Sequence, residues 1–129
     1  MKNLNEILQE ILILTISQVP LKTRIKNGIK EIDISEWGWK DNWLEIVDLE
    51  KKQCVVREYY KNGNKWWEQE YQNGKRHGKS IGWYKNGNKS WKIEYQNGKR
   101  HGKSIRWYKN GNKWREEEYQ NGELVKKIL

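Results

Sequence analysis

A tandem repeat governs the second half of this chain. Glu70 to Asn88 reads EYQNGKRHGKSIGWYKNGN, and Glu94 to Asn112 repeats it with Arg106 in place of Gly82 as the one difference. Within the repeats the tetrapeptide Tyr-x-Asn-Gly recurs at alternating shorter and longer spacings, beginning at Tyr60, Tyr71, Tyr84, Tyr95, Tyr108 and Tyr119. Such repetition is typical of one supersecondary unit stacked on copies of itself. The repeat therefore constrains the fold strongly and the partner weakly.

Asn-Gly between strand-like runs is the strongest short-range signal for a β-hairpin. A two-residue type I′ turn needs positive φ at both central positions, which Asn and Gly tolerate best. The predicted structural turns are Asn62-Gly63, Asn73-Gly74, Asn86-Gly87, Asn97-Gly98, Asn110-Gly111 and Asn121-Gly122. They predict a mainly β fold, a single-layer antiparallel β-meander of hairpin repeats with about eight or nine strands and an N-terminal α-helix.

Two-residue turns would also fix the register of the strands. Around Asn73-Gly74 the predicted pairs are Tyr71 with Arg76, Glu70 with His77, Gln69 with Gly78, Glu68 with Lys79 and Trp66 with Ile81. Around Asn86-Gly87 they are Tyr84 with Lys89, Trp83 with Ser90 and Gly82 with Trp91. Directly opposite residues share a face. One face then collects Trp67, Tyr71, Tyr84, Trp91, Ile93, Tyr95 and Tyr108, and the other collects Trp66, Ile81, Trp83, Ile105, Trp107 and Trp114. Neither face alternates into a dry core, so we expect contacts between rings, lysines and glutamates to hold the sheet together.

The segment before the repeats has a different pattern. Asn3 to Gln18 has apolar residues at helical spacing and is closed by Pro20, which predicts an amphipathic helix that caps one face or the first strand. Three runs look like degenerate leading strands of the same sheet: Ile29 to Ile34, Leu44 to Leu49 and Gln53 to Tyr60. We therefore divide the chain into an N-terminal helix and lead-in segment, residues 1–45, and a repeat sheet, residues 46–129.

Basic charge is concentrated in the repeats. The net charge is +9, yet residues 1–58 hold nine Lys+Arg against ten Asp+Glu, while residues 59–129 hold 17 against seven. A clustered positive field favours an anionic partner, such as nucleic acid or an acidic membrane. It also keeps a thin sheet soluble, because lysines at the edges resist the addition of further strands. Both interpretations stay open.

Cys54 is the only cysteine, so the chain forms no internal disulfide and a reducing, cytoplasmic location is expected. Its neighbours Val55 and Val56 favour a packed strand over a nucleophile. No segment approaches the roughly 18 apolar residues of a membrane span.

The two histidines, His77 and His101, are predicted to lie opposite Glu70 and Glu94. Histidine–carboxylate pairs serve in acid–base and metal chemistry. A hydrogen-bonded pair that recurs in each copy of the repeat is, however, typical of packing within the unit, since catalytic groups converge in one pocket. We expect no catalytic residue, no cofactor and no metal.

Aromatic and basic side chains alternate through the repeats and form the candidate interaction surface. It consists of Trp66, Trp67, Trp83, Trp91, Trp107, Trp114, Lys79, Lys103 and Arg106. Trp, Tyr and Arg often dominate the free energy of protein interfaces. Rings between basic groups also stack bases and neutralise phosphates of single-stranded nucleic acid, and they equally hold a thin sheet together through cation–π contacts.

Two motifs resemble MORN repeats, and more closely the MORN-variant repeat found in tandem in bacterial antitoxin-like proteins. They are Tyr71 to Lys79 (YQNGKRHGK) and Trp83 to Gly87 (WYKNG), and both recur in the second copy, at Tyr95 to Lys103 and Trp107 to Gly111. The resemblance covers about Tyr59 to Gly122, somewhat over half the chain. It implies a β-hairpin array used for binding or scaffolding through protein–protein contact and, in some members, contact with anionic phospholipid. It implies no enzyme.

The expected function is a non-enzymatic MORN-repeat scaffold that binds another protein through its repeat sheet, with an antitoxin-like role among those implied. The alternative is a basic-surface module that binds anionic phospholipid or single-stranded nucleic acid. No small-molecule substrate is expected. Leu4 to Arg24 also resembles the opening of an F-box, although the later F-box helices are not evident in Ile29 to Trp43. The front segment is therefore a cap, an F-box-like element or a docking helix.

Overall fold

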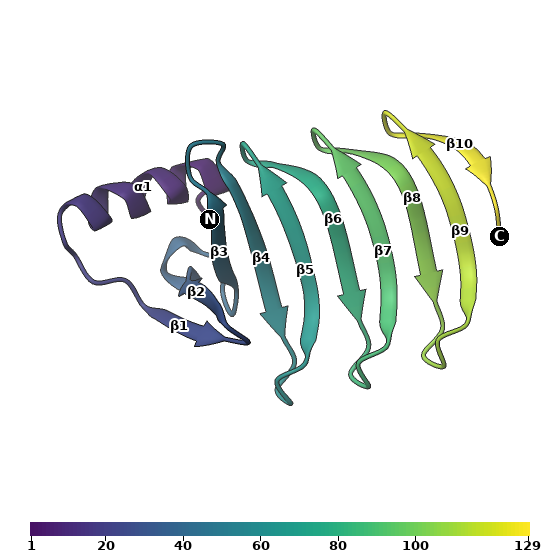
Figure 1. Ribbon diagram of the computed structural model, residues 1–129, viewed down its shortest axis with the longest axis horizontal. Helices are drawn as coiled ribbons and strands as arrows, with labels where there is room; N and C mark the ends of the chain where they lie inside the picture. The colour runs from purple at the N-terminus through teal and green to yellow at the C-terminus, as the bar shows by residue number, and fades with distance from the viewer.

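The computed structural model of this protein describes residues 1–129 (Figure 1). Its strands form one sheet, in which they lie side by side in the same order as in the chain. The strands are β1 Thr23–Lys26, β2 Ile29–Asp33, β3 Trp43–Asp48, β4 Gln53–Tyr59, β5 Lys65–Gln72, β6 Lys75–Trp83, β7 Lys89–Gln96, β8 Lys99–Trp107, β9 Lys113–Gln120 and β10 Glu123–Lys127. Every neighbouring pair is antiparallel. The predicted mainly β, single-layer antiparallel meander is confirmed. It has ten strands rather than eight or nine, and the unpredicted β1 pairs with β2 across the Asn27-Gly28 turn.

The predicted N-terminal helix is confirmed as α1, Leu4–Ile16. It begins at Asn3, whose side-chain oxygen accepts a hydrogen bond from the Glu6 backbone N–H at 2.9 Å, because the first turn of a helix has N–H groups without helical partners. Its buried residues are Leu4, Ile7, Leu8 and Ile11, which lie on one stripe at helical spacing. The helix has 13 residues, and the protein contains no helix with the length and apolar character needed to cross a membrane.

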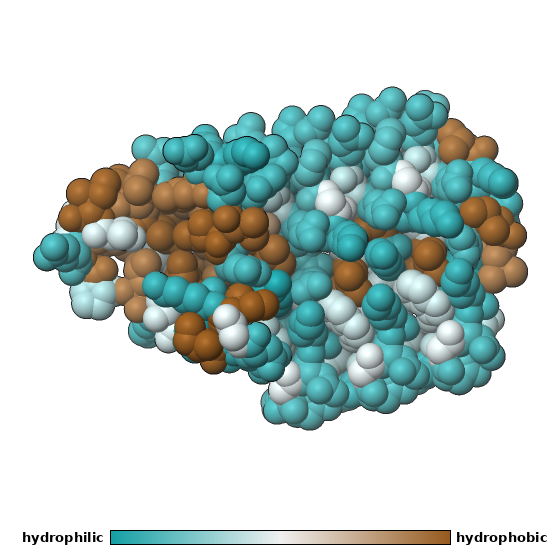
Figure 2. Space-filling view, viewed as in Figure 1, coloured by the Kyte–Doolittle hydropathy of each residue, from teal (hydrophilic) through white to brown (hydrophobic).

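This stripe packs on one face of the sheet, which we call the α1-side face. The core contains the helix stripe together with Ile32, Ile34, Trp37, Leu44, Cys54 and Val56, from β2 to β4 and the 3-10 helix η1, Ser35–Trp37. Trp67 and Tyr71 of β5 are partly buried against it. Figure 2 shows the corresponding gathering of hydrophobic side chains around α1, whereas the repeat strands display mainly hydrophilic ones. The covered core therefore ends near β5, and from β6 onward the α1-side face has no second layer.

The opposite face carries a buried ionic network at the same end of the sheet. Arg57 of β4 bonds to Glu68 on β5 at 2.8 Å and to Glu45 on β3 at 2.9 Å. The fully buried Glu31 of β2 accepts hydrogen bonds from Arg24 at 3.1 Å and from the Tyr59 hydroxyl at 2.7 Å. Buried charges need partners of this kind to offset the loss of hydration. The network therefore joins five consecutive strands, β1 to β5, across the face that α1 leaves uncovered.

The Asn-Gly turns divide into two kinds. The upper turns of Figure 1, at Asn73-Gly74, Asn97-Gly98 and Asn121-Gly122, have positive φ at both residues and are the predicted type I′ turns. The lower turns, Tyr60–Asn64, Tyr84–Asn88 and Tyr108–Asn112, have positive φ at glycine only, so the type I′ prediction is wrong there.

A second asparagine explains the longer lower turns. In the first of them the Asn62 side-chain oxygen accepts the Asn64 backbone N–H at 2.9 Å. The Tyr60 N–H donates to the Asn64 carbonyl at 2.8 Å, which closes a longer loop. Asn62 therefore acts through its side chain, as asparagine often does in turns, and Asn86 and Asn110 do the same.

The predicted register is correct at some pairs and wrong at others. Tyr71 pairs with Arg76 and Gly82 with Trp91, as expected. The pairs Gln69–Gly78, Glu68–Lys79 and Trp66–Ile81 do not form: Gln69 lies opposite Ser80, Glu68 opposite Ile81 and Trp67 opposite Gly82. Tyr84–Lys89 and Trp83–Ser90 are also wrong, since Trp83 lies opposite Lys89.

A bulge at Gly78 causes the main shift. Gly78 has φ +94°, and a Cβ there would overlap the carboxylate of Glu70. That carboxylate accepts the backbone N–H of Lys79 at 2.9 Å. Gly102 and Glu94 repeat the arrangement. This shift amounts to two residues, so it does not by itself move the side chains beyond it to the other face. The shift between Gly82 and Trp83 amounts to one residue.

Candidate interaction surface

Beyond the core, the α1-side face presents three rows of side chains that run across the strands. The Tyr/Arg row lies nearest the upper turns and contains Tyr71, Arg76, Tyr95, Arg100 and Tyr119. The middle row contains Gln69, Ser80, Ile93, Ser104 and Glu117. The Trp row contains Trp67, Gly82, Trp91, Arg106 and Arg115. Each repeat thus adds a residue from each of its two strands to all three rows.

The Tyr/Arg row is held by paired cation–π and hydrogen-bond contacts. The Arg76 guanidinium lies 5.4 Å from the centre of the Tyr95 ring and donates to its hydroxyl at 3.3 Å. Arg100 and Tyr119 repeat these contacts at 5.2 and 3.3 Å. Burial raises the pKa of the Tyr71 hydroxyl, so it stays a neutral donor at ordinary pH. The row is therefore held by its own contacts, and only its first member, Tyr71, also packs against the core.

The Trp row explains the one difference between the two repeats. The six-membered ring of Trp91 lies directly against the backbone of Gly82, where a Cβ would overlap it. In the next repeat Arg115 replaces the tryptophan, and the residue opposite it is Arg106. Trp91 also lies opposite Arg106 on its other side, but its ring packs against the backbone of Gly82, so glycine is required on that side alone.

These rows enclose a hollow of about 340 Å³ next to the end of the core. It is lined by Trp67, Gln69, Tyr71, Arg76, Ser80, Trp91, Ile93 and Tyr95. Trp67 and Tyr71 also pack against the core, so the hollow continues its apolar surface out to solvent. Its lining contains a cation and no carboxylate.

The structure divides the nine predicted surface residues among three places. Trp67, Trp91 and Arg106 come together in the Trp row. Trp83, Trp107, Lys79 and Lys103 lie on the opposite face, where Lys103 is 3.7 Å from Glu116. Trp66 and Trp114 lie beside lower turns, where their rings pack at a tilt on those of Tyr60 and Tyr108 at centroid distances of 5.8 and 6.1 Å.

The Tyr/Arg row was missing from the predicted surface. Its signal was present, because Tyr71 and Arg76 flank an Asn-Gly turn at the positions that a type I′ hairpin places opposite each other. Contacts from Arg76 to Tyr95, on the next strand, depend on the bulge at Gly78 and could not be read from the turn alone.

The histidines and glutamates do not bond to one another. His77 Nδ1 accepts the Asn97 backbone N–H at 3.3 Å, and His101 Nδ1 accepts that of Asn121 at 3.4 Å. Each histidine therefore holds the next upper turn along the sheet, while Glu70 and Glu94 hold the bulges. The predicted role in packing is thus carried by bonds to the backbone rather than by His–Glu pairs.

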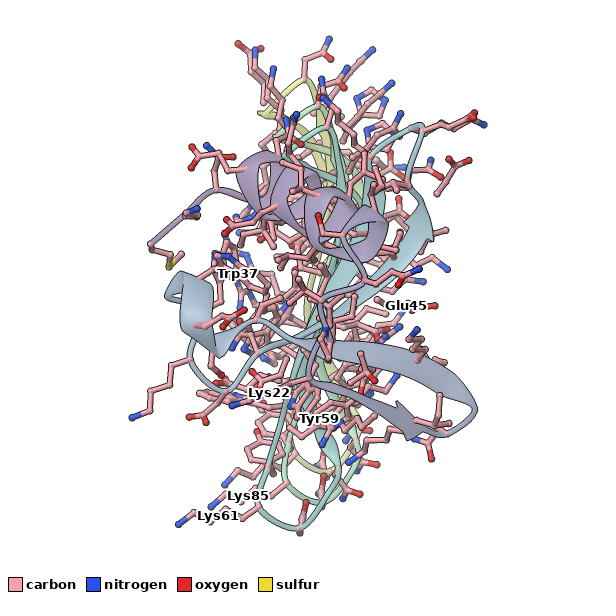
Figure 3. The ribbon with its side chains drawn as sticks, turned by 90° about the vertical axis from the view of Figure 1, so that its left-hand side faces the viewer. Lys22, Trp37, Glu45, Tyr59, Lys61 and Lys85 are labelled. Carbon is pink, nitrogen blue, oxygen red and sulfur yellow. The ribbon has the colours of Figure 1, made fainter.

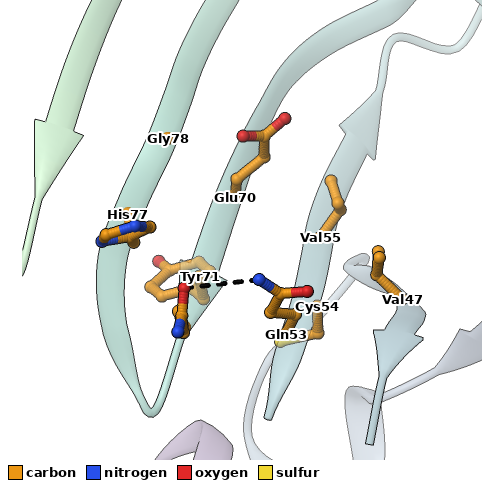
Figure 4. A pocket seen from close by; sticks show the side chains of 9 residues that line it. Val47, Gln53, Cys54, Val55, Glu70, Tyr71, His77 and Gly78 are labelled. Atoms are coloured by element: carbon orange, nitrogen blue, oxygen red, sulfur yellow. Dashed lines mark hydrogen bonds between the residues drawn. The ribbon is translucent and has the colours of Figure 1, made fainter. Parts of the chain in front are cut away.

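A hollow of about 220 Å³ on the opposite face brings His77, Glu70 and Cys54 into one lining (Figure 4). The side-chain amide of Gln53 donates to the side-chain oxygen Oε1 of Gln72 across it at 3.4 Å. The Cys54 side chain, however, belongs to the core under α1, and burial raises the pKa of its thiol to about 12. The thiol is therefore protonated near neutral pH and is not a nucleophile in this hollow.

Comparisons with known proteins do not extend this description. Family models, curated proteins and solved structures give no match to the chain. The MORN-variant resemblance of Tyr59 to Gly122 stays a prediction from its motifs.

Proposed function

We propose that this protein is a non-enzymatic repeat scaffold of MORN-variant type, which binds another protein through the α1-side face of β5 to β9. The observation that carries this proposal is the ring-lined hollow around Trp67, Trp91 and Tyr95, which continues the core and has no covering element. Large aromatic side chains in such a position supply most of the free energy of many protein interfaces.

Charge indicates the kind of partner. The three rows hold four arginines (Arg76, Arg100, Arg106 and Arg115) and one acidic residue, Glu117, which Arg115 contacts at 3.0 Å. Arginine binds carboxylates with two parallel hydrogen bonds. We therefore propose a partner with an acidic surface around an apolar anchor, and an antitoxin-like pairing with an acidic protein fits this description.

The alternative function, a basic surface for anionic phospholipid or single-stranded nucleic acid, draws on a different part of the molecule. Its support is the lysines of the lower turns, which lie outside the three rows. The two functions can therefore be separated by substitutions at separate places.

Affinity capture from a native lysate tests the proposed function, with nuclease and detergent present to remove bridging nucleic acid and lipid. The full chain should capture a protein whose recovery is lost with Trp91→Ala and retained with Trp114→Ala. Trp114 is the matched control, since it is an exposed tryptophan of the same sheet outside the hollow. Circular dichroism of both variants checks that they are folded. Recovery of nucleic acid or lipid alone, or of a protein indifferent to Trp91→Ala, would refute the proposal.

A further inference from the structure

Hydrogen bonds link each lower turn to the next along one edge of the sheet. The Tyr60 hydroxyl donates to the Trp83 carbonyl at 2.6 Å, and the Tyr84 hydroxyl donates to the Trp107 carbonyl at 2.7 Å. Side-chain amides of the asparagines add further bonds, from Asn62 and Asn64 to the Lys85 carbonyl and from Asn86 and Asn88 to the Lys109 carbonyl. Each turn is thereby fixed to the next, so the lysines at their tips are held at regular intervals.

An open pocket lies between each pair of successive lower turns. The first, about 560 Å³, is lined by Tyr59, Tyr60, Lys61, Asn62, Trp66 and Lys85. The second, about 430 Å³, is lined by Tyr60, Tyr84, Lys85, Asn86 and Lys109. Tyr84, Lys85, Asn86 and Lys109 are the next-repeat equivalents of Tyr60, Lys61, Asn62 and Lys85, so the two pockets share these four positions. Trp66 lines the first pocket alone, and Ser90 is its equivalent in the next repeat. Two strands separate the pockets, which sets their spacing at about 10 Å.

Both pockets combine aromatic ring faces with two ammonium groups. The Lys85 ammonium lies 6.0 Å from the centre of the Tyr60 ring and borders both pockets. Neither lining contains a carboxylate, so nothing within the pockets neutralises these cations. Figure 3 shows Lys61 and Lys85 extending the same way from the foot of the sheet. The edge therefore offers a row of positive charge beside ring-lined hollows at a constant interval.

We propose that this edge binds single-stranded nucleic acid, with an unpaired base in each pocket and backbone phosphates on Lys61, Lys85 and Lys109. Stacking on aromatic rings together with neutralisation by lysines is how proteins bind single strands without sequence preference. A duplex keeps its bases paired and stacked, so it cannot use the ring faces. An acidic membrane matches the charge but does not use ring-lined pockets of this repeated form. The site shares no lining residue with the ring-lined hollow around Trp67 and Trp91 and does not rest on the protein-binding function proposed above.

Fluorescence anisotropy of a labelled oligothymidylate of about 12 nucleotides, titrated with the full chain, tests this proposal. We expect binding that weakens by about 20-fold between about 50 and about 200 mM salt, since three phosphates are neutralised on a single strand. An abasic strand with the same phosphates should bind at least about fivefold more weakly, because it cannot stack. A duplex of the same length should bind more weakly too.

Two matched pairs of variants locate the site. Trp66→Leu should weaken oligothymidylate binding by about fivefold or more, whereas Trp114→Leu should not. Trp114 stacks on its tyrosine and is exposed like Trp66, but it borders neither pocket. Lys85→Gln should weaken binding and lower the salt slope by about 0.7, while Lys103→Gln, on the opposite face, removes the same charge with little effect.

Each other outcome overturns the proposal. Equal binding of the abasic and intact strands would show that charge alone acts. Equal loss with Trp66→Leu and Trp114→Leu would place binding elsewhere. Binding to vesicles of acidic lipid without binding to the oligonucleotide would assign the edge to a membrane. Lys85 is exposed and its side chain makes no hydrogen bond within the chain, so its substitution tests the site even if Trp66→Leu unfolds the sheet.

Discussion

At the scale of single residues, glycine and asparagine act differently in the two halves of each repeat. The upper turns use the left-handed backbone of Asn73 and its equivalents, which the Asn-Gly pattern predicts directly. The lower turns use the side-chain oxygen of Asn62 instead, and the second asparagine that makes this possible lies outside the dipeptide. The bulge at Gly78 depends on Glu70 from another strand, so no local pattern could reveal it.

Gly78→Ala should destabilise the fold much more than Gly87→Ala. Both glycines have positive φ, near +90°, so backbone strain of about 1 kcal/mol applies to each. Only at Gly78 would the new Cβ meet the Glu70 carboxylate, whereas nothing lies within 4 Å at Gly87. We expect a loss of about 2–4 kcal/mol for Gly78→Ala and about 1 kcal/mol for Gly87→Ala. Urea unfolding measures both, and equal losses would contradict the bulge.

At the scale of elements, α1 and the first five strands form a unit with two supports: the core on one face and the Arg57 network on the other. The helix could be predicted because its spacing is local. The network could not, since Arg57 meets Glu45 and Glu68 only once β3, β4 and β5 are in register. The strand-like runs before the repeats correctly predicted β2, β3 and β4, but they did not predict the ionic network that joins these strands.

Arg57→Gln should destabilise the protein by about 3 kcal/mol, because it removes the cation shared by Glu31, Glu45 and Glu68 and leaves the fully buried Glu31 with Arg24 as its one remaining cation. Lys2→Gln provides the comparison, since the pair of Lys2 with Glu10 lies in solvent and should matter little. Urea midpoints of the two variants measure the difference. Similar midpoints would mean that the buried network carries no more weight than a surface ion pair.

At the scale of the whole molecule, the two ends of the sheet are stabilised in different ways. The end with α1 holds the buried core, and the other end is a single layer with both faces open. The single layer is held by repeated contacts: histidines to upper turns, tyrosines to lower turns and arginines to rings. The sequence repeat predicts this regularity, whereas the place where the core stops depends on where α1 lies across the strands.

The basic residues that give residues 59–129 a net charge of +10 lie on different surfaces of the molecule. Arginines lie among the rings of the α1-side face, and lysines lie along the lower turns. Arginine suits directed contacts with carboxylates, whereas lysine acts as a compact point charge. The arginines of the α1-side face are proposed to bind a protein, and Lys61, Lys85 and Lys109 of the lower turns a single strand. Other lysines, such as Lys79 and Lys103, lie on the opposite face.

Native-state hydrogen exchange of the full chain tests this division most directly. Backbone amides open with free energies that follow local burial. Protection should be greatest in α1, β3 and β4 and should decrease steadily from β6 to β10, with β10 least protected because all of its residues are exposed. Protection in β8 and β9 equal to or greater than that of β4 would contradict the account, since it would mean that the open face of the repeats is covered.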